Sequence, residues 1–225
     1  MTTAAQVKKL VRPLLARHPE LVLIGRMIVI APVRHVLRAI YIDRTRSGDQ
    51  FNPRWAVIHL FEHSRSVWFN LGGDIYKPRP TPWHDRYPTL WWINDPETPE
   101  LLAETIETVV LPKLEPLHEL EAFYQHLISV KDHAYHLRPY QRVIVEAARG
   151  RLNDVRHVCC DELSRWSDKD EYVRLPRQIC ARLAANDIAA VAALLHDWEA
   201  TTVRNLKIEH LWKPTPFPLE TGCRR

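Results

Sequence analysis

The sequence predicts an α+β protein: an antiparallel sheet of about four strands with an N-terminal helix, followed by a helical C-terminal half. Two observations lead to this prediction. Runs rich in Val, Ile and Leu follow one another between residues 21 and 73 with short links, and short links favour antiparallel pairing because a parallel crossover needs about a dozen residues or more. From residue 139 onward, apolar residues recur at helical spacing instead.

The first expected element is an amphipathic helix over residues 3–17, with Thr3 as its cap and Pro13 as the point that limits or bends it. Two strands are expected next, over residues 21–32 and 33–45, because both runs are dense in β-branched residues. The sheet therefore begins directly after the first helix.

A turn cluster, TRSGDQFNP, precedes two further apolar runs, WAVIHLFEH and VWFNLGG, which are joined by Ser-Arg-Ser. This arrangement predicts a hairpin. Residues 76–99 are rich in proline and tryptophan, which indicates an irregular loop pinned by aromatic side chains.

Thr98 is expected to cap a helix with Pro99 at its first position, and Pro112 and Pro116 are expected to end or kink this helix. The chain is then expected to be helical to about residue 206 and extended in its proline-rich tail. We therefore predict a sheet region over residues 1–128, a helical region over 129–210 packed on it, and a tail over 211–225, or a single domain overall.

The net charge of +4 is unevenly distributed. Residues 1–50 hold 9 Lys/Arg and 3 Asp/Glu, whereas residues 51–128 hold 6 and 11. A duplex-binding surface usually has a continuous basic stripe, so no nucleic-acid partner is expected. No apolar run is long enough to span a bilayer, and no membrane association is expected.

The four cysteines are Cys159, Cys160, Cys180 and Cys223, and they include no C-x-x-C pair. Together with an N-terminus whose apolar run is short, this pattern argues against a signal peptide and a disulfide framework. A reduced, cytoplasmic protein is expected. Cys159 and Cys160 lie beside His157 and Asp161, but neighbours on a helix do not face one another, so we interpret these cysteines as small buried hydrophobes.

The stretch IHLFEHS places His59, Glu62 and His63 in the order H-x-x-E-H, which inverted zinc peptidases carry on a helix. The surrounding residues favour a strand instead. In a strand the two histidines would lie about 13 Å apart, too far to share one zinc, and Glu62 would point to the opposite face. No metal ligand, catalytic residue or cofactor is therefore predicted.

Two other sets of residues are candidates. His196 and Glu199 lie three apart on a predicted helix, but no second E-x-x-H pair exists, so a solvated helix flank is expected. The loop residues Trp83, His84, Trp91 and Trp92 form the predicted ligand-binding set, as the wall of an aromatic cleft.

Two stretches resemble a family of bacterial proteins of unknown function. They are HVLRAIYIDRT with the following VWFNLGG, and LLHDWEATTVRNLKIE. Two features depart from the family pattern: Ala39 stands where the pattern prefers glycine, and the tail after His210 is particular to this chain. The resemblance implies that IHLFEHS is a sheet strand, and it transfers no catalytic residue. Some sequences of this appearance sit near bacterial toxin or conflict systems, which implies a binding role.

The predicted function is a non-enzymatic protein-interaction module with a protein partner, such as an immunity or accessory protein of a bacterial toxin or conflict system. This prediction rests on the lack of catalytic motifs, the bipolar charge and the aromatic residues. Two alternatives stay open: a metal-dependent hydrolase using His59, Glu62 and His63, and small-ligand binding in the tryptophan-lined cleft.

Overall fold

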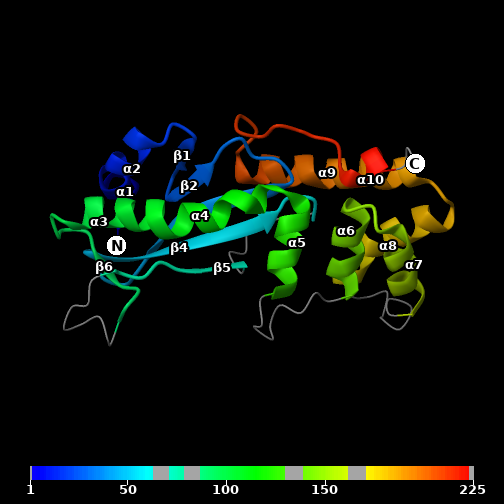
Figure 1. Ribbon diagram of the computed structural model, residues 1–225, viewed down its shortest axis with the longest axis horizontal. Coiled ribbons are helices and arrows are strands. Elements are labelled where there is room, and N and C mark those ends of the chain that lie inside the picture. Colours follow the sequence, from blue (N-terminus) through cyan, green and yellow to red (C-terminus); the bar gives the residue numbers. More distant parts are fainter. Residues whose placement is uncertain (1, 63–70, 79–86, 130–138, 162–170, 223–225) are drawn as a thin grey trace. The chain divides into compact units, whose positions relative to one another are not determined.

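The computed structural model describes residues 2–62, 71–78, 87–129, 139–161 and 171–222 (Figure 1). The chain divides into two compact units. The sheet unit comprises Met1–Ile58 and Trp68–His118, and the helical unit comprises His59–Val67 and Glu119–Arg225. The predicted α+β class, with an antiparallel sheet and a helical C-terminal half, is confirmed.

The sheet unit begins with two short helices and continues into the sheet. Its elements are α1 (Ala4–Leu10), α2 (Arg12–Arg17), β1 (Leu21–Ile24), β2 (Met27–Ile30), β3 (Val36–Arg44), β4 (Gln50–His59), β5 (Leu71–Asp74) and β6 (Trp91–Trp92). The strand order is β1-β2-β3-β4-β5, and β6 pairs with β4. The pairs β1–β2, β2–β3, β4–β5 and β4–β6 are antiparallel.

Three predictions about this unit need correction. Residues 21–32 form a hairpin of two strands rather than one strand, because Gly25 takes a left-handed φ of 63° and turns the chain. The predicted turn over residues 45–53 ends early, since β4 already begins at Gln50. The first helix is divided at Val11, and Pro13 lies in the first turn of α2, where its missing N–H costs nothing.

The predicted cap at Thr3 is confirmed. The Thr3 hydroxyl accepts the backbone N–H of Gln6, and the Gln6 side chain accepts the backbone N–H of Thr3, which completes a capping box. The predicted hairpin of the third and fourth apolar runs is also present, because Val57 of β4 pairs with Leu71 of β5.

A long helical run completes the sheet unit. It comprises α3 (Thr98–Thr105), the π-helix η1 (Ile106–Val110), α4 (Leu111–Leu114) and the 3-10 helix η2 (Glu115–His118). The prediction that Thr98 caps this helix is wrong, because Thr98 is its first residue and Glu97 takes the cap position without a side-chain capping hydrogen bond. Arg38 of β3 is buried beneath the end of this run and donates to the carbonyl oxygens of Leu114 and Glu115. The π and 3-10 segments are the irregularities expected from Pro112 and Pro116.

The described part of the helical unit consists mainly of helices. They are α5 (Leu120–Ser129), α6 (Pro139–Ala148), α7 (Leu152–Asp161), α8 (Glu171–Ala184), α9 (Ile188–Leu206) and α10 (Pro218–Thr221). The tail is not wholly extended as predicted, because α10 forms within it and Phe217 is completely buried. Within the described ranges, no helix has the length and apolar character needed to cross a bilayer.

One ion pair of the helical unit is almost completely buried. Arg149 Nη1 lies 2.6 Å from Glu146 Oε2, and Glu146 is only 3% exposed. The same guanidinium lies 3.5 Å from the centre of the Tyr124 ring and contacts Glu121, whose side chain is 59% exposed. Arg149 thus neutralises the buried Glu146 carboxylate and also contacts an exposed one.

Candidate functional site

The H-x-x-E-H stretch lies where β4 ends. The strand stops at His59, and the chain then bends through Leu60, Phe61 and Glu62. The prediction that Glu62 points away from His59 is therefore wrong: Glu62 Oε2 lies 2.7 Å from His59 Nε2. His63 lies outside the described residues.

His59 is enclosed by apolar side chains. It is 9% exposed, and its ring centre lies 5.1 Å from that of Phe61 and 5.7 Å from that of Phe123. Burial acts to raise the pKa of Glu62, but the hydrogen bond and charge of His59 outweigh it, so the pKa of Glu62 lies below its ordinary value. Thr202 of α9 donates to the carbonyl oxygen of Glu62, which fixes the bend.

This pair supplies two polar side chains, which is fewer than a zinc site requires. No group of three or more His, Cys, Asp or Glu side chains that could hold an ion occurs within residues 2–62, 71–78, 87–129, 139–161 and 171–222. The described part of the stretch is a strand end closed by a histidine–carboxylate pair.

The predicted aromatic cleft falls partly outside the described residues, because Trp83 and His84 are not among them. Trp91 is described and has no exposed surface. Its indole N–H donates to the carbonyl oxygen of Ile75 at 2.9 Å, and its ring stacks on Phe51. Trp91 is therefore part of the core of the sheet unit, whereas Trp92 is half-buried.

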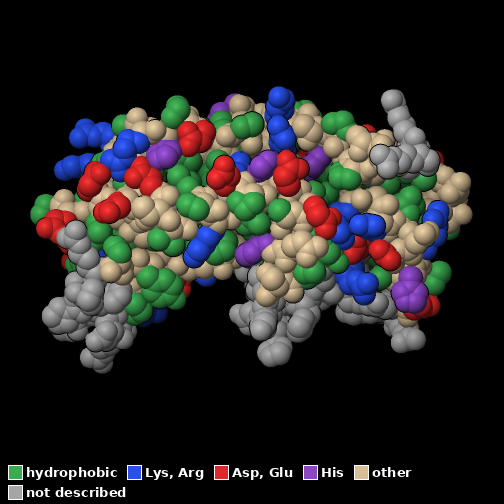
Figure 2. Space-filling model, viewed as in Figure 1, with side chains coloured by type: hydrophobic (Ala, Val, Ile, Leu, Met, Phe, Trp, Pro, Cys, Tyr) green, Lys and Arg blue, Asp and Glu red, His purple; other side chains and the backbone are tan. Residues whose placement is uncertain are grey.

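Two exposed tyrosines lie beside these tryptophans. Tyr76 is 56% exposed and Tyr87 is 50% exposed. The backbone N–H of Lys77 donates to the carbonyl oxygen of Pro88, so the two backbone segments that carry these tyrosines lie side by side. We call Tyr76, Tyr87 and Trp92 the aromatic patch. Figure 2 shows hydrophobic side chains gathered at the lower edge of the sheet unit.

The backbone under the patch is firmly held. Ile75 and Lys77 are buried on either side of Tyr76, so the alternation of an extended segment directs Tyr76 outward. The Lys77 ammonium lies 4.7 Å from the centre of the Trp92 ring and 4.0 Å from Asp95 Oδ2. Lys77 thus fixes the buried edge of the patch.

His196 and Glu199 do not form a solvated flank, because Glu199 has no exposed surface. His196 Nδ1 lies 3.8 Å from Glu199 Oε2, and His196 Nε2 lies 2.8 Å from Glu220 Oε2 of α10. Glu220 also accepts the backbone N–H of Phe217. His196 therefore joins α9 to the tail. It lies beside an open hollow of about 570 Å³, which is lined by three alanines of α9 together with Ile188, His196, Leu219 and Glu220.

The prediction that the cysteines are not disulfide-bonded is wrong. Cys159 of α7 and Cys180 of α8 form a disulfide, and both residues are half-buried. Cys160 is a free, exposed cysteine rather than a buried hydrophobe. The signal for this pair was the placement of one cysteine on each of two successive predicted helices.

Several other titratable groups form surface ion pairs in the sheet unit. Glu107, on the π-helix η1, lies 2.7 Å from Arg17 Nε and 3.0 Å from His18 Nε2. The hydrogen bond from Arg17 is the largest cause that holds the pKa of Glu107 below its ordinary value. These side chains connect α2 to the long helical run, which is a structural role.

No family model, curated protein or solved structure matches this chain. The resemblance to bacterial proteins of unknown function therefore stays a prediction.

Proposed function

We propose that this chain is a non-enzymatic protein-interaction module that binds a partner through the aromatic patch of its sheet unit. The supporting observation is the pair of half-exposed tyrosines, Tyr76 and Tyr87, on a firmly held backbone. Tyrosine and tryptophan supply large contact areas at low entropic cost, and they are enriched in protein interfaces.

The net charge of the sequence segment that contains the patch supports one kind of partner. Residues 51–128, which include the whole patch, hold 6 Lys/Arg and 11 Asp/Glu. Opposite charges on two surfaces speed their association and help to select the partner. The proposed partner is therefore a protein with a basic surface that presents apolar or arginine side chains, since arginine stacks well on aromatic rings.

The more specific proposal is an immunity or accessory protein of a bacterial toxin or conflict system, acting in the cytoplasm. It rests on the resemblance of HVLRAIYIDRT, VWFNLGG and LLHDWEATTVRNLKIE to bacterial proteins of unknown function. A co-encoded basic protein that binds this chain with one-to-one stoichiometry would be the expected partner.

The test is capture of the partner from an extract of the organism that encodes the chain. Tyr76→Ser with Tyr87→Ser should reduce recovery of a stoichiometric basic partner at least tenfold, because buried interface tyrosines are often hot spots. Val109→Ser is the matched control, since Val109 is another exposed apolar residue of the same unit, at 45% exposure. Equal recovery with the double variant and the wild type would refute the proposal.

A metal-dependent hydrolase is the second candidate, supported by the contact between His59 and Glu62 at 2.7 Å. It requires further ligands outside the described residues, with His63 as the first choice. Elemental analysis of the purified chain would show stoichiometric zinc or iron that is lost in His59→Ala. Purified protein without either metal would count against this candidate.

A further inference from the structure

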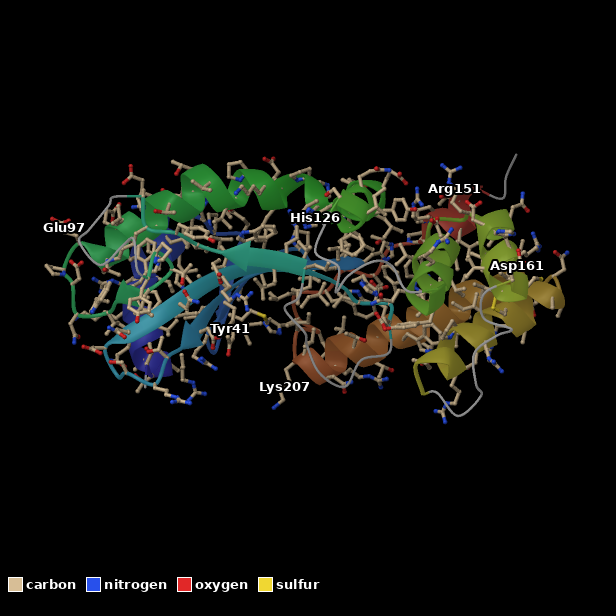
Figure 3. The ribbon with its side chains drawn as sticks, turned by 90° about the horizontal axis from the view of Figure 1, so that it is seen from below. Tyr41, Glu97, His126, Arg151, Asp161 and Lys207 are labelled. Carbon is tan, nitrogen blue, oxygen red and sulfur yellow. A yellow bond between two sulfur atoms is a disulfide. The ribbon has the colours of Figure 1, made fainter. Side chains whose placement is uncertain are left out.

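The disulfide between Cys159 and Cys180 lies at the surface of the helical unit. Figure 3 shows its sulfur–sulfur bond near Asp161, at the end of α7. Both cysteines are half-buried, so part of each residue is open to solvent. In contrast, Val155 and Val158 of α7 are completely buried.

Besides the disulfide, both helices are held by buried apolar side chains. Ile179 and Leu183 of α8 are buried like the two valines of α7, and each helix therefore has its own apolar contacts with the unit. Cleavage of the bond removes a covalent link but leaves this apolar surface in place. The bond can therefore react while the helices stay folded.

An arginine precedes each sulfur by three residues. Arg156 precedes Cys159 on α7, and Arg177 precedes Cys180 on α8. Residues three apart on a helix lie on the same face. Cationic neighbours stabilise a cysteine thiolate and so make it a better leaving group. They also attract an anionic thiol toward the bond.

We propose that the Cys159–Cys180 disulfide is a site of reversible modification by an anionic low-molecular-weight thiol of the glutathione type. The thiolate attacks one sulfur of the bond, a mixed disulfide forms, and the other cysteine leaves as a thiolate that takes up a proton. A second thiolate then attacks the outer sulfur of the mixed disulfide. Two thiols are thereby oxidised to their disulfide, and Cys159 and Cys180 are both reduced.

This site is independent of the aromatic patch, which belongs to the other unit. Where a disulfide occurs in a reducing compartment, it is usually transient and redox-sensing. The proposed cytoplasmic location would therefore place this bond among disulfides that respond to the thiol pool.

The experiment uses the full oxidised chain with Cys160→Ser and Cys223→Ser, so that the only remaining cysteines are the two of the bond. The chain is incubated with reduced glutathione at neutral pH, the reaction is quenched with acid, and intact masses are recorded over time. We expect a glutathione adduct and then the dithiol form, with an unchanged far-ultraviolet circular dichroism spectrum.

The matched variants test the role of charge. Arg177→Gln should slow the reaction with glutathione severalfold and should slow it less with neutral 2-mercaptoethanol. Arg174→Gln is the control, because Arg174 is an exposed arginine of the same helix, six residues from Cys180 and on another face. Two free thiols in the untreated chain, reaction only after addition of denaturant, or equal rates for the two arginine variants would each overturn the proposal.

Discussion

Replacement of Arg149 by methionine tests whether the helical unit depends on its buried ion pair. Arg149 Nη1 lies 2.6 Å from Glu146 Oε2, and Glu146 is 3% exposed. Methionine keeps much of the apolar stem of the arginine and removes its charge. The carboxylate of Glu146 then loses its contact with the Arg149 guanidinium in a site that water reaches poorly.

The size of the effect follows from the burial of each partner. Removing one member of a buried pair costs about 3–5 kcal/mol, because the remaining charge is uncompensated. The contact of Arg149 with Glu121 contributes much less, since the Glu121 side chain is 59% exposed and exposed pairs are typically worth about 1 kcal/mol or less. Arg149→Met should therefore cost several times more than Glu121→Gln.

Urea unfolding followed by circular dichroism measures this difference. With an m-value of about 2 kcal/mol/M, a loss of about 4 kcal/mol moves the midpoint of the helical unit down by about 2 M. The double variant Glu146→Gln with Arg149→Met should recover most of this loss, because a neutral amide is less costly to bury than an unpaired carboxylate. If Arg149→Met and Glu121→Gln lower the midpoint equally, the reasoning is refuted.

Three further predictions concern pH and backbone packing. The pKa values of Glu107 and Glu62 are lowered, so the stability that these carboxylates contribute is present above about pH 4.3, the ordinary pKa of glutamate. It is lost as pH falls through their lower pKa values in the folded chain. Urea midpoints should therefore drop between about pH 5 and pH 3, and Glu107→Gln should flatten that drop. Burial, with a hydrogen bond to Glu146, raises the pKa of Tyr124, so the stability that the neutral phenol contributes is present below about pH 10 and is lost as pH rises through the raised pKa. The ultraviolet titration of the wild type minus that of Tyr124→Phe should show one phenol that ionises above about pH 10. A phenol that ionises at a lower pH would contradict this expectation. A Cβ at Gly72 would lie 1.9 Å from the carbonyl oxygen of Trp55, whereas a Cβ at Gly73 would first meet the Trp55 side chain at 3.2 Å. Gly72→Ala should therefore lower the melting temperature far more than Gly73→Ala. Equal effects of the two substitutions would show that β4 and β5 do not pair in this register.

The regular elements were predictable where local signals agree. Thr3 with Gln6 gives a capping box, and the apolar runs around Val57 and Leu71 give a hairpin. Composition alone does not predict the division of residues 21–32 into two strands, because Gly25 lies within a continuous run of strand-forming residues. A glycine with a left-handed φ ends a strand even when the residues on both sides favour one.

The misjudged side chains depend on contacts between distant segments. The contact of Glu62 with His59 needs a bend that Thr202 fixes from α9, and helical spacing alone does not show that Glu199 is buried. The disulfide joins residues 21 positions apart, through the packing of α7 on α8. Exposure of Tyr76 likewise follows from the burial of its two neighbours, which a loop rich in proline does not reveal.

The most direct test of the central claim is hydrogen exchange of the chain alone and in complex with the captured basic partner. The proposal predicts that peptides covering residues 71–78 and 87–93 gain protection in the complex. Peptides from α7 and α8 should exchange equally in both samples. Protection confined to the helical unit, with no change around Tyr76 and Tyr87, would contradict the proposed binding surface.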